Sequence, residues 1–180
     1  MKNFLNLLLL AFTFQCQPKA TQTTTQIQGK SEVPSSLKNT HQELLQQLHQ
    51  FTLIKDGSAP FALKLEELML HHFTEEEDFI LPPLGLLPSL ANGKDPEDYK
   101  EIMALSEKAK LQMDHMSAEH QLIIAYIGEL KEASTEENRP AIIQFEKEVA
   151  KHAISDEEVY FPASIMVGEY LKLKSDLKTN

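Results

Sequence analysis

The chain of 180 residues is long enough for one domain with a single core. Its formal net charge of −10 argues against nucleic acid as a partner. A single cysteine, Cys16, excludes a disulfide framework and a cysteine-based zinc site. The absence of Trp and the many Leu, Glu, Lys and Gln residues favour helix over sheet.

The beginning of the chain predicts a lipoprotein-type signal segment over residues 1–16. A positive start at Lys2 precedes an apolar run over residues 5–14, and Cys16 follows. The run is too short to span a bilayer but suits a secretory signal. We expect lipidation at Cys16 and export to a membrane of the bacterial cell envelope, although Gln15 stands where a small residue is usual. Secretion without a lipid, a retained anchor and a cytoplasmic location are the alternatives.

Four amphipathic helices are predicted after a flexible Gln/Thr-rich tether over residues 17–34. Pro60 and Pro140 suit the first turn of a helix, whereas Pro82 and Pro162 are expected to end one. A tail over residues 163–180 is expected to add at most a short helix. The four helices are expected at residues 36–54, 60–81, 96–131 and 140–162. This order predicts an all-α, antiparallel four-helix bundle over residues 35–162, built from a duplicated helical hairpin.

The two hairpins share a motif of a histidine followed by an acid. Glu76 lies four residues after His72, and Asp156 lies four residues after His152. Each motif continues with further acids, apolar or aromatic residues, and a proline ten residues after the histidine. Residues four apart on a helix lie on one face, so each pair can offer one nitrogen and one oxygen to the same metal ion.

A further histidine recurs on the helix before each motif. His41 precedes a stripe of leucines, and His120 precedes a matching stripe of isoleucines. One histidine on an apolar stripe is more often an ordinary core residue, but four at matching positions favour a shared site. Burying four imidazoles and two carboxylates together would be costly, and a pair of metal ions removes that cost.

The donor set narrows the choice of metal. Imidazoles mixed with carboxylates suit iron, manganese or zinc better than copper(I) or calcium. Two shared carboxylates indicate a dinuclear centre with metals ~3.5–4 Å apart. No histidine has the acid three residues before it that ferritin-like centres use, and the His-Glu-x-x-His motif of zinc proteases is absent.

From about Ser36 to Pro162 the chain resembles the hemerythrin-like, or HHE cation-binding, family, whose pattern is a histidine, then His-x-x-x-Glu-Glu, repeated. The resemblance implies a four-helix bundle with two non-haem iron ions, manganese or zinc being less favoured. The segment from Met116 to His120 is also similar to the Met-x-x-Glu-His segment of di-iron proteins linked to iron–sulfur repair. By matching position, the implied metal ligands are His41, His72, Glu76, His120, His152 and Asp156.

Several residues near these positions need a separate interpretation. Oxygen-carrying hemerythrins have a fifth histidine where this chain has Ile124, so His115 is a less certain further ligand. Glu157 is an alternative to the acid before it, because some hemerythrins use the next residue along. His49 is expected in the core or behind a ligand, and His71 on the surface.

Three classes of function remain open. The leading hypothesis is a non-enzymatic di-iron protein of the cell envelope that handles oxygen, nitric oxide or iron itself. The alternatives are a di-iron oxidoreductase acting on peroxide, nitric oxide or oxygen, with Tyr126 and Tyr160 as redox-active candidates, and a metal-free anchored bundle that serves as an interaction module.

Overall fold

The computed structural model describes residues 31–96 and 99–179. The predicted signal segment, its Cys16 and most of the tether lie outside these residues. The α-helices are α1 (Ser35–Thr52), α2 (Ala59–Glu75), α3 (Leu87–Ala91), α4 (Lys100–Ala133), α5 (Arg139–Ser155) and α6 (Phe161–Thr179). Short π-helical turns follow α2 and α5, at Glu76–Ile80 and Asp156–Tyr160, and a 3₁₀ turn spans Pro82–Leu86.

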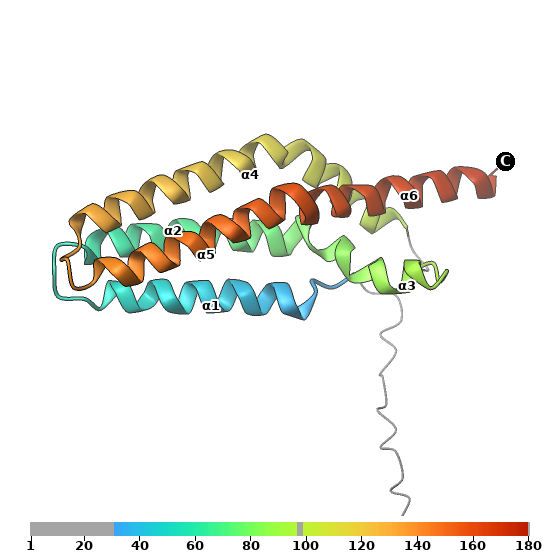
Figure 1. Ribbon diagram of the computed structural model, residues 1–180. Coiled ribbons are helices and arrows are strands. Elements are labelled where there is room, and N and C mark those ends of the chain that lie inside the picture. The colour runs from blue at the N-terminus through green and yellow to red at the C-terminus, as the bar shows by residue number, and fades with distance from the viewer. Residues whose placement is uncertain (1–30, 97–98, 180) are drawn as a thin grey trace, which may run out of the picture.

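Four of these helices, α1, α2, α4 and α5, lie side by side along the long axis of the molecule (Figure 1). Each contacts two of the others: α1 and α4 both pack against α2 and α5. The described part of the chain has no strand. The all-α four-helix bundle that the sequence predicted is therefore confirmed.

The loops after α1 and α4 meet at one end of the bundle (Figure 1). Asp56, in the first loop, accepts a 2.8 Å hydrogen bond from the backbone N–H of Ser58. Its other oxygen accepts bonds from the backbone N–H of Thr135 at 3.3 Å and from the side-chain amide of Asn138 at 3.1 Å, both in the second loop. Its interactions with Ser58, above all, hold the pKa of Asp56 well below its usual range, with further contributions from Asn138 and Thr135. One carboxylate thus joins the two hairpins.

The bundle has two main apolar clusters, one toward each end. The cluster nearer the hairpin loops contains Leu44, Leu48, Phe51, Ala62, Leu65, Met69, Phe73, Ile123, Ile127, Leu130, Ile142, Phe145 and Val149. The other contains Val33, Leu37, Phe79, Ile80, Leu81, Leu84, Ala109, Met116 and Phe161. Along each of the four segments that supply predicted metal ligands, these ligands fall between residues of the first cluster and residues of the second. A polar layer is therefore enclosed by hydrophobic packing on both sides.

The prediction that the fourth helix ends at Pro162 is wrong. The π turn after α5 runs directly into α6, a helix of 19 residues that extends beyond the bundle (Figure 1). Pro162 is the second residue of α6, and the first turn of a helix tolerates proline because its N–H groups lack intrahelical partners. The π turn changes the hydrogen-bonding register, so Pro162 can occupy the first turn of α6 although the helix continues directly from the π turn.

Close packing fixes α6 against α4. A Cβ added at Gly168 would lie 2.3 Å from the Cβ of Ser106, so only glycine allows this approach. The Ser106 hydroxyl donates a 3.0 Å hydrogen bond to the carbonyl of Ser164, whose own hydroxyl donates to the carbonyl of Ile80. These buried hydroxyls tie α6, α4 and the end of the first hairpin together next to the polar layer.

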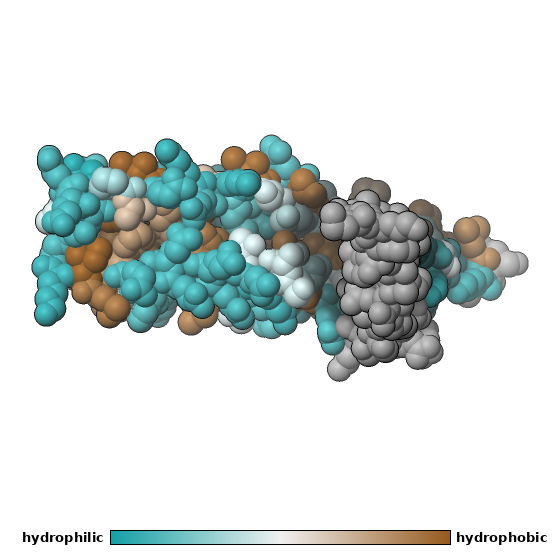
Figure 2. Space-filling view, turned by 60° about the horizontal axis from the view of Figure 1, so that its bottom comes forward, coloured by the Kyte–Doolittle hydropathy of each residue, from teal (hydrophilic) through white to brown (hydrophobic). Residues whose placement is uncertain are grey.

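The surface seen in Figure 2 is mainly hydrophilic, with separate hydrophobic patches. None of the helices in the described part combines the length and the apolar character needed to span a bilayer. At the start of the described chain, Val33 is already buried in the core, and Pro34, rather than a serine, precedes the first turn of α1.

Candidate metal centre

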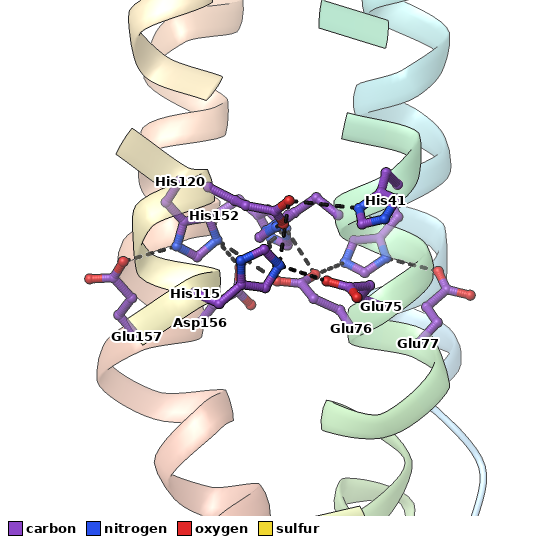
Figure 3. Close-up of polar contacts among 12 residues, drawn as sticks. His41, Glu75, Glu76, Glu77, His115, His120, His152, Asp156 and Glu157 are labelled. Atoms are coloured by element: carbon purple, nitrogen blue, oxygen red, sulfur yellow. Dashed lines mark hydrogen bonds and ion pairs between the residues drawn. The ribbon is translucent and has the colours of Figure 1, made fainter. Parts of the chain in front are cut away.

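Six side chains from four helices meet in the polar layer (Figure 3). His41 comes from α1 and His120 from α4. The other two histidines come from the ends of α2 and α5, and each has its acid in the π turn that follows. All six are at most 8% exposed. The residues that meet are His41, His72, Glu76, His120, His152 and Asp156. The structure thus places the six principal predicted site residues together.

Each of the two acids is the first residue of a π-helical turn. Glu76 begins the turn after α2, and Asp156 begins the turn after α5. The backbone N–H of Leu81 donates to the carbonyl of Glu76 at 2.8 Å, which closes the wider π ring. Such turns insert one residue into a helix and are frequent at functional sites. Here the same turn, at the same place in both hairpins, aims a carboxylate inward and redirects the residues that follow.

Glu76 lies at the centre of the group, with two histidines at each of its oxygens. Its Oε2 is 3.1 Å from Nε2 of His41 and 3.8 Å from Nε2 of His152. Its Oε1 is 3.2 Å from Nε2 of His72 and 3.8 Å from Nε2 of His120. The atoms within each set lie within 4.8 Å of one another, close enough to hold one cation per set. Glu76 therefore belongs to two three-residue groups at once.

Asp156 connects the same two sets on another side. Its Oδ2 is 3.2 Å from Nε2 of His152 and 3.8 Å from Nε2 of His120. These histidines belong to different sets around Glu76. Both carboxylates are therefore placed between the two pairs of imidazoles, which is the arrangement expected of ligands shared by two ions.

The atoms that face the middle of the group make no hydrogen bonds. Although the shorter contacts have ion-pair distances, none has the angles of a hydrogen bond. The unsatisfied atoms are Nε2 of the four histidines and both oxygens of each carboxylate. Buried polar atoms are almost always satisfied, because an unpaired one costs about 1–3 kcal/mol. Eight such atoms converging on one point are explained by cations as their common partner.

The charges of the two carboxylates lead to the same conclusion. Burial opposes ionisation of Glu76, but the imidazoles of His120, His41 and His72 outweigh it and hold the pKa of Glu76 well below its usual range. Burial raises the pKa of Asp156 to about 9, and the charge of Glu76 adds to the shift. Burial and the charge of Glu76 thus both oppose ionisation of Asp156. A bound cation would supply the positive charge that lets both acids ionise.

Carboxylates on the outer side orient three of the four histidines. Nδ1–H of His41 donates to Glu77 at 2.8 Å, and Nδ1–H of His120 donates to Glu157 at 2.9 Å. Figure 3 shows these two acids on opposite flanks of the site. Because a carboxylate only accepts, each of these bonds places a proton on Nδ1 and leaves Nε2 as the inward nitrogen that can bind a metal ion. Such partners fix the tautomer and the ring of a metal-binding histidine.

Glu119 does the same for His72, whose Nδ1–H donates to its Oε2 at 2.9 Å. His152 is different: within the described residues, its Nδ1 has no carboxylate partner. The position that corresponds to Glu119 in the first half of the chain is Thr40. The two halves of the site are therefore not equivalent.

A surface groove of about 320 Å³ lies on the side of His152, between α1 and α5. His152 and Tyr160 both line it, as does Thr40. Burial lowers the pKa of His152 to about 4, so its ring is neutral and free to bind a cation. The groove gives a small solute a short path to this edge of the polar layer.

The remaining candidate residues lie away from the middle of the group. Glu157 holds the outer nitrogen of His120, and its side chain is 43% exposed. His115 lies on the surface 3.1 Å from Glu75, and His71 is exposed as expected. The interpretation of His49 as a core residue is wrong, because it is exposed and pairs with a surface glutamate.

The sequence predicted the two inner carboxylates as metal ligands, but it did not predict that outer carboxylates orient the histidines. The repeat contains a signal for two of them, since Glu77 and Glu157 each directly follow an inner acid. Glu119 has no counterpart in the other half. Its contact with His72 depends on how α2 and α4 pack, which periodicity does not specify.

Comparison with protein-family models gives one match, to the hemerythrin HHE cation binding domain, over residues 33–164. The chain belongs to this family. No curated protein and no solved structure matched the chain. The matched range begins at the first buried core residue and ends just after the π turn that follows the second histidine–acid pair. Family membership shows cation binding, and the buried, unsatisfied imidazoles and carboxylates fit that role.

Proposed function

We propose that this hemerythrin-like protein holds two iron ions in the polar layer and uses them to bind oxygen or nitric oxide, or to store and donate iron. The observation that carries the proposal is the division of four inward Nε2 atoms into two pairs, with Glu76 and Asp156 between them. One ion would be held by His41 and His152, and the other by His72 and His120, with both acids shared.

The donor set supports iron among the possible metals. Four imidazoles and two carboxylates suit iron, manganese and zinc, and the resemblance to hemerythrins favours iron. Six donors shared between two ions supply fewer bonds than two octahedral ions require, so each ion would have room for a small ligand. Ile124, at the place of a fifth histidine, is half-buried and packs on the adjoining apolar cluster. It supplies no donor.

Access to the centre supports a diatomic ligand. The groove beside His152 reaches the site from the surface, and the apolar clusters on both sides of the layer exclude larger solutes. Bound iron would supply redox chemistry and a position for such a ligand. The protein's own residues orient three of the imidazoles through outer carboxylates and partly shield all four from water.

A di-iron oxidoreductase is the second candidate function. The observation that favours it is Tyr160, which lines the same groove as His152. A phenol at that position could exchange an electron and a proton with the centre. Tyr126 is placed differently: its ring lies under the ammonium of Lys64.

We further propose that the protein works in a bacterial cell envelope. The support is the apolar run that ends at Cys16, which would carry the lipid. A membrane anchor at this residue would hold the bundle at a surface through the Gln/Thr-rich segment.

Elemental analysis of the purified full chain tests the proposed function directly. After expression in iron-replete medium, we expect close to two iron ions per chain, with an absorption spectrum that changes when nitric oxide or azide is added. Steady turnover of peroxide or nitric oxide with an electron donor would favour the oxidoreductase. A folded chain that holds no metal and takes up none on reconstitution would refute both.

A further inference from the structure

Four metal-binding side chains lie together outside the buried centre, on the surface between α2 and α4. They form two pairs with the spacing His-x-x-x-Glu: His71 with Glu75 on α2, and His115 with Glu119 on α4. Residues at this spacing share one face of a helix. The two helices pack against each other, so the pairs face one another.

Three of these groups lie close enough to share one ion, and His115 lies beside them. Nε2 of His115 is 3.1 Å from Oε2 of Glu75 and 3.7 Å from Oε1 of Glu119. Nδ1 of His71 is also 3.7 Å from Oε1 of Glu119. The ligand atoms of His71, Glu75 and Glu119 all lie within 4.8 Å of one another. Figure 3 shows His115 and Glu75 reaching toward each other from facing helices.

Glu119 is a preformed part of this cluster rather than a mobile surface acid. It is only 9% exposed, and its Oε2 is fixed by the 2.9 Å bond to His72. Its Oε1 is directed between the imidazoles of His71 and His115 at distances too long for a hydrogen bond. An oxygen whose side chain is held in place, with an imidazole nitrogen 3.7 Å away on each side, is a ready ligand for a cation.

We propose that His71, Glu75, His115 and Glu119 form a second, exposed site for a divalent transition-metal ion, and that this site loads the buried centre. Two imidazoles and two carboxylates match the preferences of iron(II), zinc and related ions. The side chains of His71 and His115 are 61% and 46% exposed, so an ion can reach them directly from solvent.

The cluster is not a consequence of the internal repeat, because the other half of the chain lacks it. In the other half, the four corresponding positions are Ser36, Thr40, Lys151 and Ser155. Three of these line the groove beside His152. One edge of the bundle therefore carries four metal-binding groups at positions where the other edge has three hydroxyls and a lysine. The cation site belongs to one edge only.

Glu119 gives the surface site a direct connection to the interior. One of its oxygens belongs to the surface cluster, and the other contacts His72, an imidazole of the buried centre. An ion held at the surface would thus be one side chain away from the polar layer. This loading role rests on the proposed function, whereas the existence of the surface site does not.

A pair of matched double variants tests the inference in the full chain. His115→Ala with Glu75→Gln removes one histidine and one acid from the cluster without touching the buried centre. His49→Ala with Glu66→Gln is the control, because this exposed pair also joins two helices, at 2.9 Å, but has no third ligand beside it.

The first measurement is the number of zinc ions retained at equilibrium by protein whose buried centre is already filled with iron. The wild type and the control should each bind one zinc ion more than the His115/Glu75 variant. We expect affinity at the surface site to fall at least about tenfold, because even indirect metal partners contribute 10–100-fold. Equal zinc binding by all three proteins would refute the proposed surface site.

The second measurement is the rate at which iron(II), at limiting concentration, fills the metal-free buried centre. We expect loading to be about tenfold slower in the His115/Glu75 variant than in the control, with the same final iron content. Equal rates would overturn the loading role. If no protein takes up iron, the proposed function fails, while zinc binding to the metal-free chain still tests the surface site.

Discussion

Replacing Glu76 by glutamine should weaken both metal positions at once. Glu76 is fully buried, and its two oxygens serve different pairs of histidines. Glutamine keeps the size of the side chain but removes its charge and turns one oxygen into an NH₂ donor. By contrast, His41→Gln removes a ligand from only one of the two sets.

The outer acids give a scale for the expected loss of metal affinity. An outer partner of a metal ligand typically contributes 10–100-fold in affinity, or about 1.4–2.7 kcal/mol. We expect this from Glu157→Gln, which makes the same chemical change at the outer nitrogen of His120. A direct, shared ligand should cost more than about 100-fold at each position. Competition with a chromogenic chelator measures both, with far-UV circular dichroism as the check on folding.

The comparison between the two glutamines separates a shared inner ligand from an outer partner of a ligand. A folded Glu76→Gln protein that keeps both ions with unchanged affinity would refute its shared role. A larger loss in Glu157→Gln than in Glu76→Gln would contradict the assignment of Glu157 as an outer partner. His41→Gln should retain about one ion, and loss of both would show that the two positions fill only together.

Four further substitutions test the scaffold and the location. Gly168→Val should lower the melting temperature by separating α6 from α4, because an added Cβ would be 2.3 Å from Ser106. Gly128→Ala is the matched control, since an added Cβ there has nothing within 4 Å. It should add about 0.5–1 kcal/mol of helix stability in a denaturant titration. The pKa of Asp56 is lowered in the folded protein, so the stability that this carboxylate contributes is present above its unfolded pKa of 3.8 and is lost as the pH falls below that value. The Asp56→Asn protein should therefore have a lower melting temperature at neutral pH and lose less stability on acidification. Cys16→Ala should leave an unprocessed precursor or release the protein from the membrane fraction, and unchanged processing would contradict lipidation.

The internal repeat explains why the sequence predicted the fold and the grouping of six side chains. Helical spacing places each histidine and its acid on one face, and the apolar stripe tells which face is buried. What the pattern does not contain is the register change at Glu76 and Asp156. A proline after an acidic run is usually evidence that a helix stops, and both Pro82 and Pro162 follow such a run. The residues after them differ, because Pro83 and Gly85 follow the first proline whereas Ala163 and Ser164 follow the second.

The two halves of the molecule share a scaffold but differ at its edges. The inner ligands, the π turns and the outer acids Glu77 and Glu157 all recur in both. The edges formed by α2 with α4 and by α1 with α5 do not. At the first, Glu119 closes the site behind His72 and meets a histidine-rich surface. At the second, Thr40 leaves the outer nitrogen of His152 without an acid and opens a groove. A symmetric pair of ions in this scaffold would thus experience two different surroundings. We expect the metal to be loaded through the histidine-rich edge and a small ligand to enter through the groove at the other edge.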